Sequence, residues 1–189
     1  MTVKRARLYD AIVALIVVSI IALDQWTKTL ALDHLSLGIY EPFPGIGHYL
    51  GLELVRNSGA AFSMFTNNVF LVVLILAAVL VVVYLYTRML NSGPLFFKIV
   101  FGLIIGGAAG NLLDRAFRGG SVVDFVSFRI PEISFQFAIF NIADACISIG
   151  VILLFVLLIF GGGFNRTAGE EKKEAEPAPS GNPVPTQKP

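Results

Sequence analysis

The sequence is poor in cysteine, histidine and charge. Its 189 residues include one cysteine, Cys146, which excludes an intramolecular disulfide and a cysteine-ligated metal cluster. The two histidines, His34 and His48, stand alone and give no basis for metal binding. Charged residues make up 14% and leave a net charge of +1, with no basic stripe among the aromatic residues. We therefore expect no metal or other cofactor, and no nucleic-acid partner.

Apolar side chains are what the sequence has in excess. Hydrophobic residues make up 56% of the chain, with 16 phenylalanines, and the mean hydropathy is +0.77. A soluble domain of this size leaves much of its surface exposed, so it cannot hide so many apolar side chains. The remaining apolar surface must face lipid, which predicts an integral membrane protein.

Four apolar runs are long enough to cross a bilayer, whose core of about 30 Å needs about 20 helical residues. They cover residues 11–32, 69–86, 95–113 and 139–160. The first follows three basic residues, as a signal peptide would, but no small-residue cleavage site ends it and three further runs come after it. We therefore expect it to be retained, and predict an all-α membrane protein with four transmembrane helices.

Four spans place both termini on one side of the membrane. Nine basic residues fall on the side of the termini and five on the other, which predicts cytoplasmic termini. Residues 161–189 begin with three glycines, continue with a Glu/Lys run and contain five prolines. This composition predicts a disordered cytoplasmic tail behind a transmembrane domain of residues 1–160.

The two outer loops contain apolar residues at alternate positions, which predicts short β-strands outside the membrane. No internal repeat is evident, which weakens an inverted-repeat transporter. The alternating positions are Leu50, Leu52 and Leu54 in the first loop, and Val123, Phe125, Ile133, Phe135 and Phe137 in the second.

Polar residues gather at the outer ends of the spans and in the outer loops. Charges at such positions are costly, so each is a functional hypothesis whose partner has to be found. Five segments converge on one leaflet, and we expect them to form one shallow polar site. Its members are Asp24 and Lys28 of the first run, Asn57 of the first loop, Asn111, Asp114 and Arg115 of the third run, Asp124 of the second loop, and Asn141 and Asp144 of the fourth run.

Most of these residues also admit a structural interpretation. Asp24 and Lys28 are four residues apart and fit a structural ion pair on one helix face. Asp114 and Arg115 fit an interface anchor, in a glycine-rich helix end that also allows close packing. Asn57 fits a turn or a helix cap. None of these pairs identifies a function by itself.

Asp144 is harder to explain structurally. It lies one turn inside an apolar helix, with Phe140 and Ser148 at the i−4 and i+4 positions, so its partner must come from elsewhere, and Asp124 is the best candidate. Two close carboxylates cannot both ionise, so one keeps a proton. The ionised member can then take a proton from water while the protonated member polarises a scissile carbonyl, without a metal or a covalent intermediate.

Two aspartates 20 residues apart are not a specific signature. A small proton-coupled transporter would also need membrane carboxylates, although its site should lie near the midplane, whereas these residues lie toward one face. A non-catalytic scaffold would leave Asp144 unexplained. The spacing alone leaves these alternatives open beside an aspartyl hydrolase.

Five short motifs, in order over about residues 8–160, resemble those of the signal peptidase II family, the bacterial lipoprotein signal peptidases. Each motif is weak alone, but five in order at the expected membrane positions are specific. They are Asp24-Gln25-x-x-Lys28, Asn57-x-Gly59-Ala60-Ala61-Phe62, Gly110-Asn111-Leu112-x-Asp114-Arg115, Val123-Asp124-Phe125 and Phe140-Asn141-x-Ala143-Asp144.

The resemblance implies an aspartyl endopeptidase of the bacterial cytoplasmic (inner) membrane, active at the outer, periplasmic face. It implies cleavage of diacylglyceryl-modified prolipoproteins just before the lipidated cysteine, contact with membrane lipid, and inhibition by the cyclic peptide globomycin. By motif position, Asp124 and Asp144 would be the catalytic pair. The residues implied to position this pair, the substrate backbone and the lipid head are Asp24, Lys28, Asn57, Gly59, Asn111, Asp114, Arg115, Asn141 and Ala143.

Overall fold

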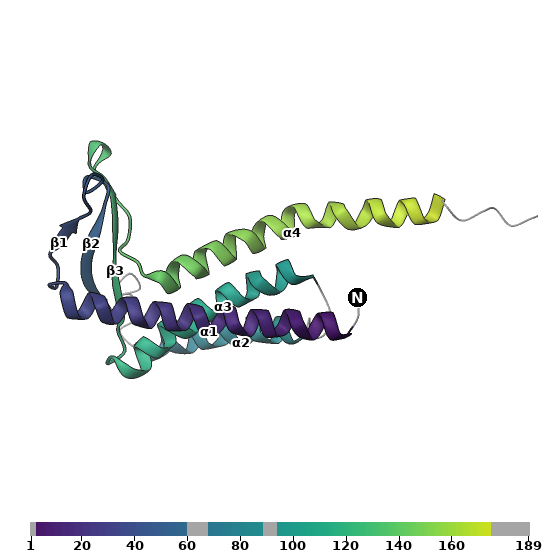
Figure 1. Cartoon of the computed structure of the whole chain (residues 1–189), viewed down its shortest axis with the longest axis horizontal. Coiled ribbons are helices and arrows are strands. Elements are labelled where there is room, and N and C mark those ends of the chain that lie inside the picture. The colour runs from purple at the N-terminus through teal and green to yellow at the C-terminus, as the bar shows by residue number, and fades with distance from the viewer. Residues whose placement is uncertain (1–2, 60–67, 89–93, 175–189) are drawn as a thin grey trace, which may run out of the picture. The chain divides into compact units, whose positions relative to one another are not determined.

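The computed structural model describes residues 3–59, 68–88 and 94–174 (Figure 1). The motif residues Ala60, Ala61 and Phe62 lie outside the described residues. The chain forms two units, Met1–Leu154 and Phe155–Pro189. The sheet and the polar cluster described below belong to the first unit.

Each of the four apolar runs forms a helix, as predicted. Among the described residues, α1 and α3 have the length and hydropathy of bilayer-spanning helices, whereas the described apolar stretches of the other two, Leu76–Thr87 and Ile142–Leu157, are shorter. Four transmembrane helices therefore remain a prediction. The bounds are Val3–His34 for α1, Asn68–Thr87 for α2, Leu95–Phe117 for α3 and Ile142–Glu174 for α4.

The last helix is longer than expected. We expected residues 161–189 to be disordered, but α4 continues to Glu174, while residues 175–189 lie outside the described residues. The Glu/Lys run before Glu174 consists of good helix formers, and this local preference extends the helix beyond the three glycines.

Glycines let α3 approach α1 closely. Gly102, Gly106 and Gly110 recur every four residues and so share one face of α3. A Cβ atom on Gly106 would lie 3.1 Å from the Cβ of Ile20, and one on Gly110 would lie 2.7 Å from an oxygen of Asp24. The missing side chains therefore bring the polar end of α3 against the polar end of α1.

The two loops that follow the first and third apolar runs form a four-stranded antiparallel sheet in the order β1-β2-β3-β4. This confirms the strands predicted from Leu50 to Leu54 and at Val123 and Phe125. Of the predicted alternation at Ile133, Phe135 and Phe137, only Phe135 lies in a strand, because Ile133 ends a short helix. Strand β1 was not predicted. In Figure 1 the labelled strands lie at the end of the helices where α1 finishes and α4 begins. The bounds are Tyr40–Pro42 for β1, Leu50–Asn57 for β2, Val122–Ile130 for β3 and Phe135–Gln136 for β4, with the short helix η2 at Pro131–Ile133.

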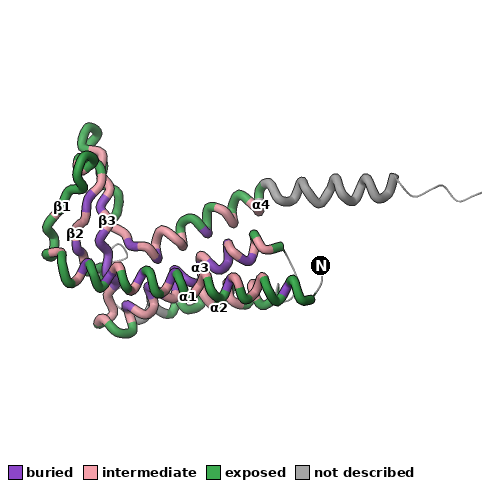
Figure 2. The backbone as a smooth tube through the Cα atoms, in the orientation of Figure 1, coloured by how far each residue is buried: buried purple, intermediate pink, exposed green. Residues whose placement is uncertain are grey.

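The sheet packs against the end of α1 through a small apolar core. Ala31 of α1, Leu54 of β2, and Val123 and Phe125 of β3 are buried together, and the inner part of β3 is coloured as buried in Figure 2. Successive side chains of a strand point to opposite faces. Because the side chains of Val123 and Phe125 lie in this core, the side chain of Asp124 between them projects from the other face of β3.

Candidate active site

Asp124 is held by two side-chain amides. Its exposed fraction is 1%. One carboxylate oxygen, Oδ1, accepts a hydrogen bond from Asn141 Nδ2 at 2.6 Å, and the other accepts one from Asn57 Nδ2 at 2.9 Å. Asn57 is itself fixed, because its Oδ1 accepts the backbone N–H of Gly59 at 2.9 Å. Gly59 has a φ of 86°, a conformation that favours glycine, so this turn depends on the residue type at position 59.

Asp144 lies in the first turn of α4. Its Oδ1 accepts a hydrogen bond from Asn111 Nδ2 of α3 at 2.7 Å. Its Oδ2 accepts the backbone N–H of Asn141 at 3.3 Å, while its own N–H donates to Asn141 Oδ1 at 2.9 Å. This reciprocal pair is a helix N-cap, so the start of α4 positions the carboxylate.

Asn141 therefore contacts both carboxylates. It is fully buried, and its side-chain amide, which donates to Asp124, also lies 3.2 Å from Asn111 Oδ1 and 3.3 Å from the carbonyl oxygen of Val123. The structure thus brings together the two aspartates that the sequence singled out. They lie on different elements, joined through one asparagine.

The pKa of Asp124 is raised to about 6, mainly by burial and also by the negative charge of Asp144. The hydrogen bonds from Asn57 and Asn141 and the charge of Lys28 act in the opposite direction. Desolvation is the largest of these effects. This carboxyl can consequently hold a proton much closer to neutral pH than an ordinary aspartate can.

Behind the two aspartates lies a buried ion cluster centred on Lys28. Its Nζ lies 2.8 Å from Asp24 Oδ2, 2.9 Å from Asp114 Oδ2 and 3.0 Å from Asn111 Oδ1. The side chains of Lys28, Asp24 and Asp114 have no exposed surface. The ion pair expected on α1 is present, and α3 extends it with a second carboxylate and an amide.

The two carboxylates of this cluster also hold the backbone beside the aspartates. Asp24 Oδ1 accepts the N–H of Ala143 at 3.0 Å, and Asp114 Oδ2 accepts the N–H of Val123 at 3.0 Å. Ala143 precedes Asp144, and Val123 precedes Asp124. The cluster thus fixes the chain immediately before each aspartate, on α4 and on β3.

Arg115 lies at the side of the site. Its guanidinium donates to the carbonyl oxygen of Asn111 at 3.3 Å and interacts electrostatically with Asp144, Asp124 and Asp114.

Two supporting residues were missed by the sequence analysis. Gln25 Nε2 donates to Asp114 Oδ1 at 2.9 Å and to Asp24 Oδ2 at 3.2 Å. Arg118 forms an ion pair with Asp114. Gln25 stands inside the first motif and Arg118 four residues after Asp114, so position in a motif and helical spacing were the available signals.

A hollow of about 420 Å³ opens beside Asp144. Asn57 and Asp144 provide its polar wall, and Phe137, Phe140 and Ile149 contribute apolar walls. Among the residues that the structure describes, no group of three or more His, Cys, Asp or Glu side chains is arranged to hold a metal ion. The hollow offers an extended apolar ligand one carboxylate, that of Asp144, and Asn57 links its polar wall to Asp124 through a hydrogen bond.

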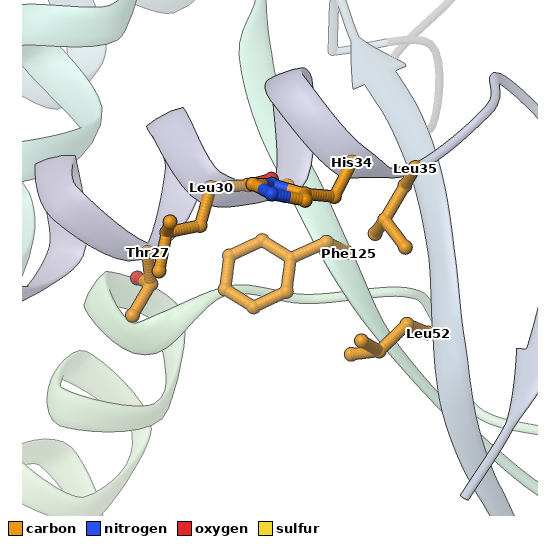
Figure 3. Close-up of a pocket in the computed structure, with 7 residues that line it drawn as sticks. Thr27, Leu30, His34, Leu35, Leu52 and Phe125 are labelled. Carbon is orange, nitrogen blue, oxygen red and sulfur yellow. The ribbon is translucent and has the colours of Figure 1, made fainter.

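A second hollow, of about 390 Å³, lies between the end of α1 and the sheet (Figure 3). Leu30 and His34 of α1 lie on one side of it, and Leu52 of β2 and Phe125 of β3 line it from the sheet. Its walls are almost wholly apolar and contain neither aspartate. It is therefore separate from the candidate catalytic pair.

The model of the family described as "Signal peptidase (SPase) II" matches residues 16–160. The chain belongs to the signal peptidase II family. Several relatives of this chain are named lipoprotein signal peptidase. The one from Geobacillus thermodenitrificans is 40% identical over 146 residues, and the match covers 77% of this chain and 88% of the relative. One from Mycobacterium avium is 41% identical over 175 residues, covering 90% of this chain and 88% of the relative.

A solved structure described as a bacterial membrane enzyme is also similar to this member of the signal peptidase II family. Its TM-score is 0.68 at 31% identity, and the match covers 79% of this chain and 94% of that structure. The family is one of aspartic-type peptidases, which confirms the predicted enzyme class and gives the transporter alternative no support. The chain is a bacterial membrane enzyme with membrane-spanning helices.

Proposed function

We propose that this chain cleaves the signal peptide from diacylglyceryl-modified prolipoproteins, just before the lipidated cysteine, with Asp124 and Asp144 as its catalytic residues. The observation that carries the proposal is the contact of Asn141 with both carboxylates. The family membership and the relatives' names support the substrate class.

The chemistry needs one shared proton. A water molecule between the carboxyl groups attacks the scissile carbonyl carbon, and the ionised carboxylate takes a proton from it. The protonated carboxyl donates to the carbonyl oxygen, which gives a neutral tetrahedral intermediate. When the C–N bond breaks, the amine leaves with the proton that the dyad took from water, and a hydroxyl of the intermediate returns its proton to the other carboxylate as the product carboxyl group forms. The pair ends with one proton, as it began, and needs no metal.

The raised pKa of Asp124 suits this sharing, because a carboxyl near its pKa can both give and accept a proton. The neutral amides of Asn57 and Asn141 hold Asp124 without adding a positive charge that would keep it ionised. Lys28 and the carboxylates bound to it position the backbone of Val123 and Ala143 and so orient the pair.

The hollow beside Asp144 is the proposed place for the substrate. Its apolar side chains suit a signal peptide that lies within the membrane, and Asn57 and Asp144 meet the scissile bond where the polar residues gather. Membrane lipid and a globomycin-type peptide are the other proposed ligands.

The proposed topology has four spans and cytoplasmic termini. Residues 1–160 form the peptidase domain in the bacterial cytoplasmic membrane, and residues 161–189 form a cytoplasmic tail. The site then opens to the outer, periplasmic face, where an exported prolipoprotein presents its lipidated cysteine. The family match ends at residue 160, which supports this boundary.

The test uses the purified full chain with a diacylglyceryl-modified and an unmodified form of one prolipoprotein. The modified form should be cut just before the cysteine, the unmodified form should be cut much more slowly, and globomycin should block both. Equal cleavage of the two forms would contradict the lipidated substrate, and cleavage at another bond would contradict the proposed specificity.

A further inference from the structure

The edge of the sheet that leads into α4 exposes a row of apolar side chains. The three hydrophobic residues at alternate positions here, Ile133, Phe135 and Phe137, have exposed fractions of 69%, 45% and 50%. We refer to these three residues as the apolar edge. Edge strands are normally protected by charges or by covering elements. Of residues 131–139 only Glu132 carries a charge, and its carboxylate accepts a hydrogen bond from Tyr49 at 2.8 Å.

The apolar edge lies on the side of the sheet that leads to α4. β4 pairs with the far end of β3, and the chain then returns along β3, where Phe137 donates to the carbonyl oxygen of Phe128 and Phe140 bridges to Val126. α4 begins at Ile142, directly after this return. Figure 1 shows β1 and β2 on the opposite side of β3 from α4.

The surface of the apolar edge also continues onto α4. Phe137 and Ile149 line the same hollow, and Ile149 and Ile152 of α4 have exposed fractions of 51% and 62%. In a membrane protein, apolar side chains that are exposed on a helix in this way are in contact with lipid. The apolar edge therefore extends a lipid-facing surface sideways from the point where α4 leaves the sheet.

We propose that the apolar edge inserts into the boundary between headgroups and acyl chains of the outer leaflet and anchors the sheet to the bilayer. The proposal rests on the proposed topology, which places the sheet at the outer face. Apolar side chains beside a neutral backbone suit this interfacial layer, where an amphipathic segment sinks by about 5–10 Å. Anchoring at both α4 and the apolar edge would hold β3, and with it Asp124, at a constant depth.

Tryptophan fluorescence tests the depth of this segment. The chain has a single tryptophan, Trp26, so a Trp26→Phe background allows one new tryptophan to be read alone. Phe135→Trp and Ile133→Trp report on the apolar edge. Ile39→Trp is the matched control, because Ile39 has a similar exposed fraction, 55%, and directly precedes β1 at the opposite edge of the sheet.

The full-length variants are reconstituted in vesicles whose lipids carry bromine either near the ester end or near the terminal methyl of the acyl chain. With shallow bromines, the fluorescence of the Phe135→Trp and Ile133→Trp variants should fall by about half. With deep bromines the loss should be about twofold smaller, as an interfacial depth requires. The Ile39→Trp control should lose little with either lipid.

The same samples are assayed for prolipoprotein cleavage, which separates the two proposals. Absence of quenching at both positions of the apolar edge in a protein that still cleaves would overturn the anchor and leave the proposed function standing. Equal quenching at position 39 would also overturn it, because the contact would then not be specific to this edge. Absence of cleavage by the unsubstituted chain, with quenching intact in the variants, would count against the proposed function alone.

Discussion

Asn141 donates a hydrogen bond from its side-chain amide to Asp124, at 2.6 Å. The two residues belong to different elements, since Asn141 caps α4 and Asp124 lies near the start of β3. The return of the chain along β3, marked by the bridge between Phe140 and Val126, brings them together. Any movement of α4 relative to the sheet would therefore alter the spacing of the proposed catalytic pair.

The first prediction concerns the pair itself. Asp124→Asn and Asp144→Asn change almost no volume, but each removes a carboxyl that must carry or share the proton. Each should abolish measurable cleavage, since general acid–base participation contributes about 10²–10⁴-fold. The double variant should be no worse than either single one, because the two residues act as a unit. Cleavage of a diacylglyceryl prolipoprotein is the measurement.

Asp33→Asn is the matched control for this series. Asp33 is an exposed carboxylate at the end of α1, and its loss should leave the rate unchanged. Both dyad variants should still purify as helical proteins and bind globomycin. Near-normal cleavage by either one would remove that aspartate from the proposed mechanism.

The second prediction concerns Lys28. Removing it leaves Asp24 and Asp114 buried without their shared cation, and breaking a buried ion pair in this way costs about 3–5 kcal/mol. Lys28→Met should therefore lower the thermal unfolding temperature markedly while leaving measurable turnover. Adding Asp114→Asn should destabilise the protein by less than the sum of the single changes, because one of the two stranded charges is also removed. A stable Lys28→Met protein without turnover would make Lys28 a direct participant.

The third prediction concerns pH. The pKa of Asp124 is raised to about 6, so the carboxyl is protonated below this pH and ionised above it. If it carries the shared proton, kcat/KM should fall as the pH rises through about 6. The hydrogen bond from Asn57 lowers this pKa, so Asn57→Ala should move the alkaline limb to higher pH. If the alkaline fall of kcat/KM stays at the same pH in Asn57→Ala, or moves to lower pH, the group that titrates there is not Asp124.

The fourth prediction concerns helix packing. A Cβ atom on Gly107 would lie 2.4 Å from the carbonyl oxygen of Ala143. This is a backbone atom, so a change of side-chain rotamer cannot relieve the clash. Gly107→Ala should push the start of α4 away from α3, weaken the hydrogen bond between Asn111 and Asp144, and cost about 1–3 kcal/mol of stability. Cleavage rate and thermal unfolding measure the two effects.

Gly102→Ala serves as the comparison for Gly107→Ala. Its Cβ would lie 2.9 Å from a methyl group of the Val13 side chain, which is part of the packing far from the aspartates. Its effect should be confined to stability. A larger loss of cleavage in Gly102→Ala than in Gly107→Ala would contradict the role assigned to the contact between α3 and α4.

The fifth prediction concerns topology. After Cys146 is replaced, cysteines at Ser58 and Ser121 should react with an impermeant thiol reagent added to intact spheroplasts. Cysteines at Ser92 and Ser180, two positions outside the described residues, should react only after permeabilisation. The reverse pattern would place the site on the cytoplasmic face, where an exported prolipoprotein could not meet it.

Much of the fold could be predicted because it depends on local sequence. A long apolar run in lipid has to satisfy its own backbone hydrogen bonds, so each of the four runs became a helix. Alternation likewise predicted β2 and β3. The Glu/Lys run before Glu174 shows the limit of composition, because the same residues that suggested a disordered tail are good helix formers.

The sequence by itself also indicated most of the residues of the site, because charges and amides at the ends of apolar helices are costly unless they lie together. It did not decide how they pair: the position of Asp144 in an apolar helix suggested Asp124 as its partner, and the family resemblance made this pair specific. Only the tertiary structure showed that Asp24 holds Ala143, that Asp114 holds Val123, and that Gln25 and Arg118 support them. These contacts depend on how far each helix is rotated and shifted against its neighbours. That register is decided by packing between residues far apart in the chain, and no local pattern encodes it.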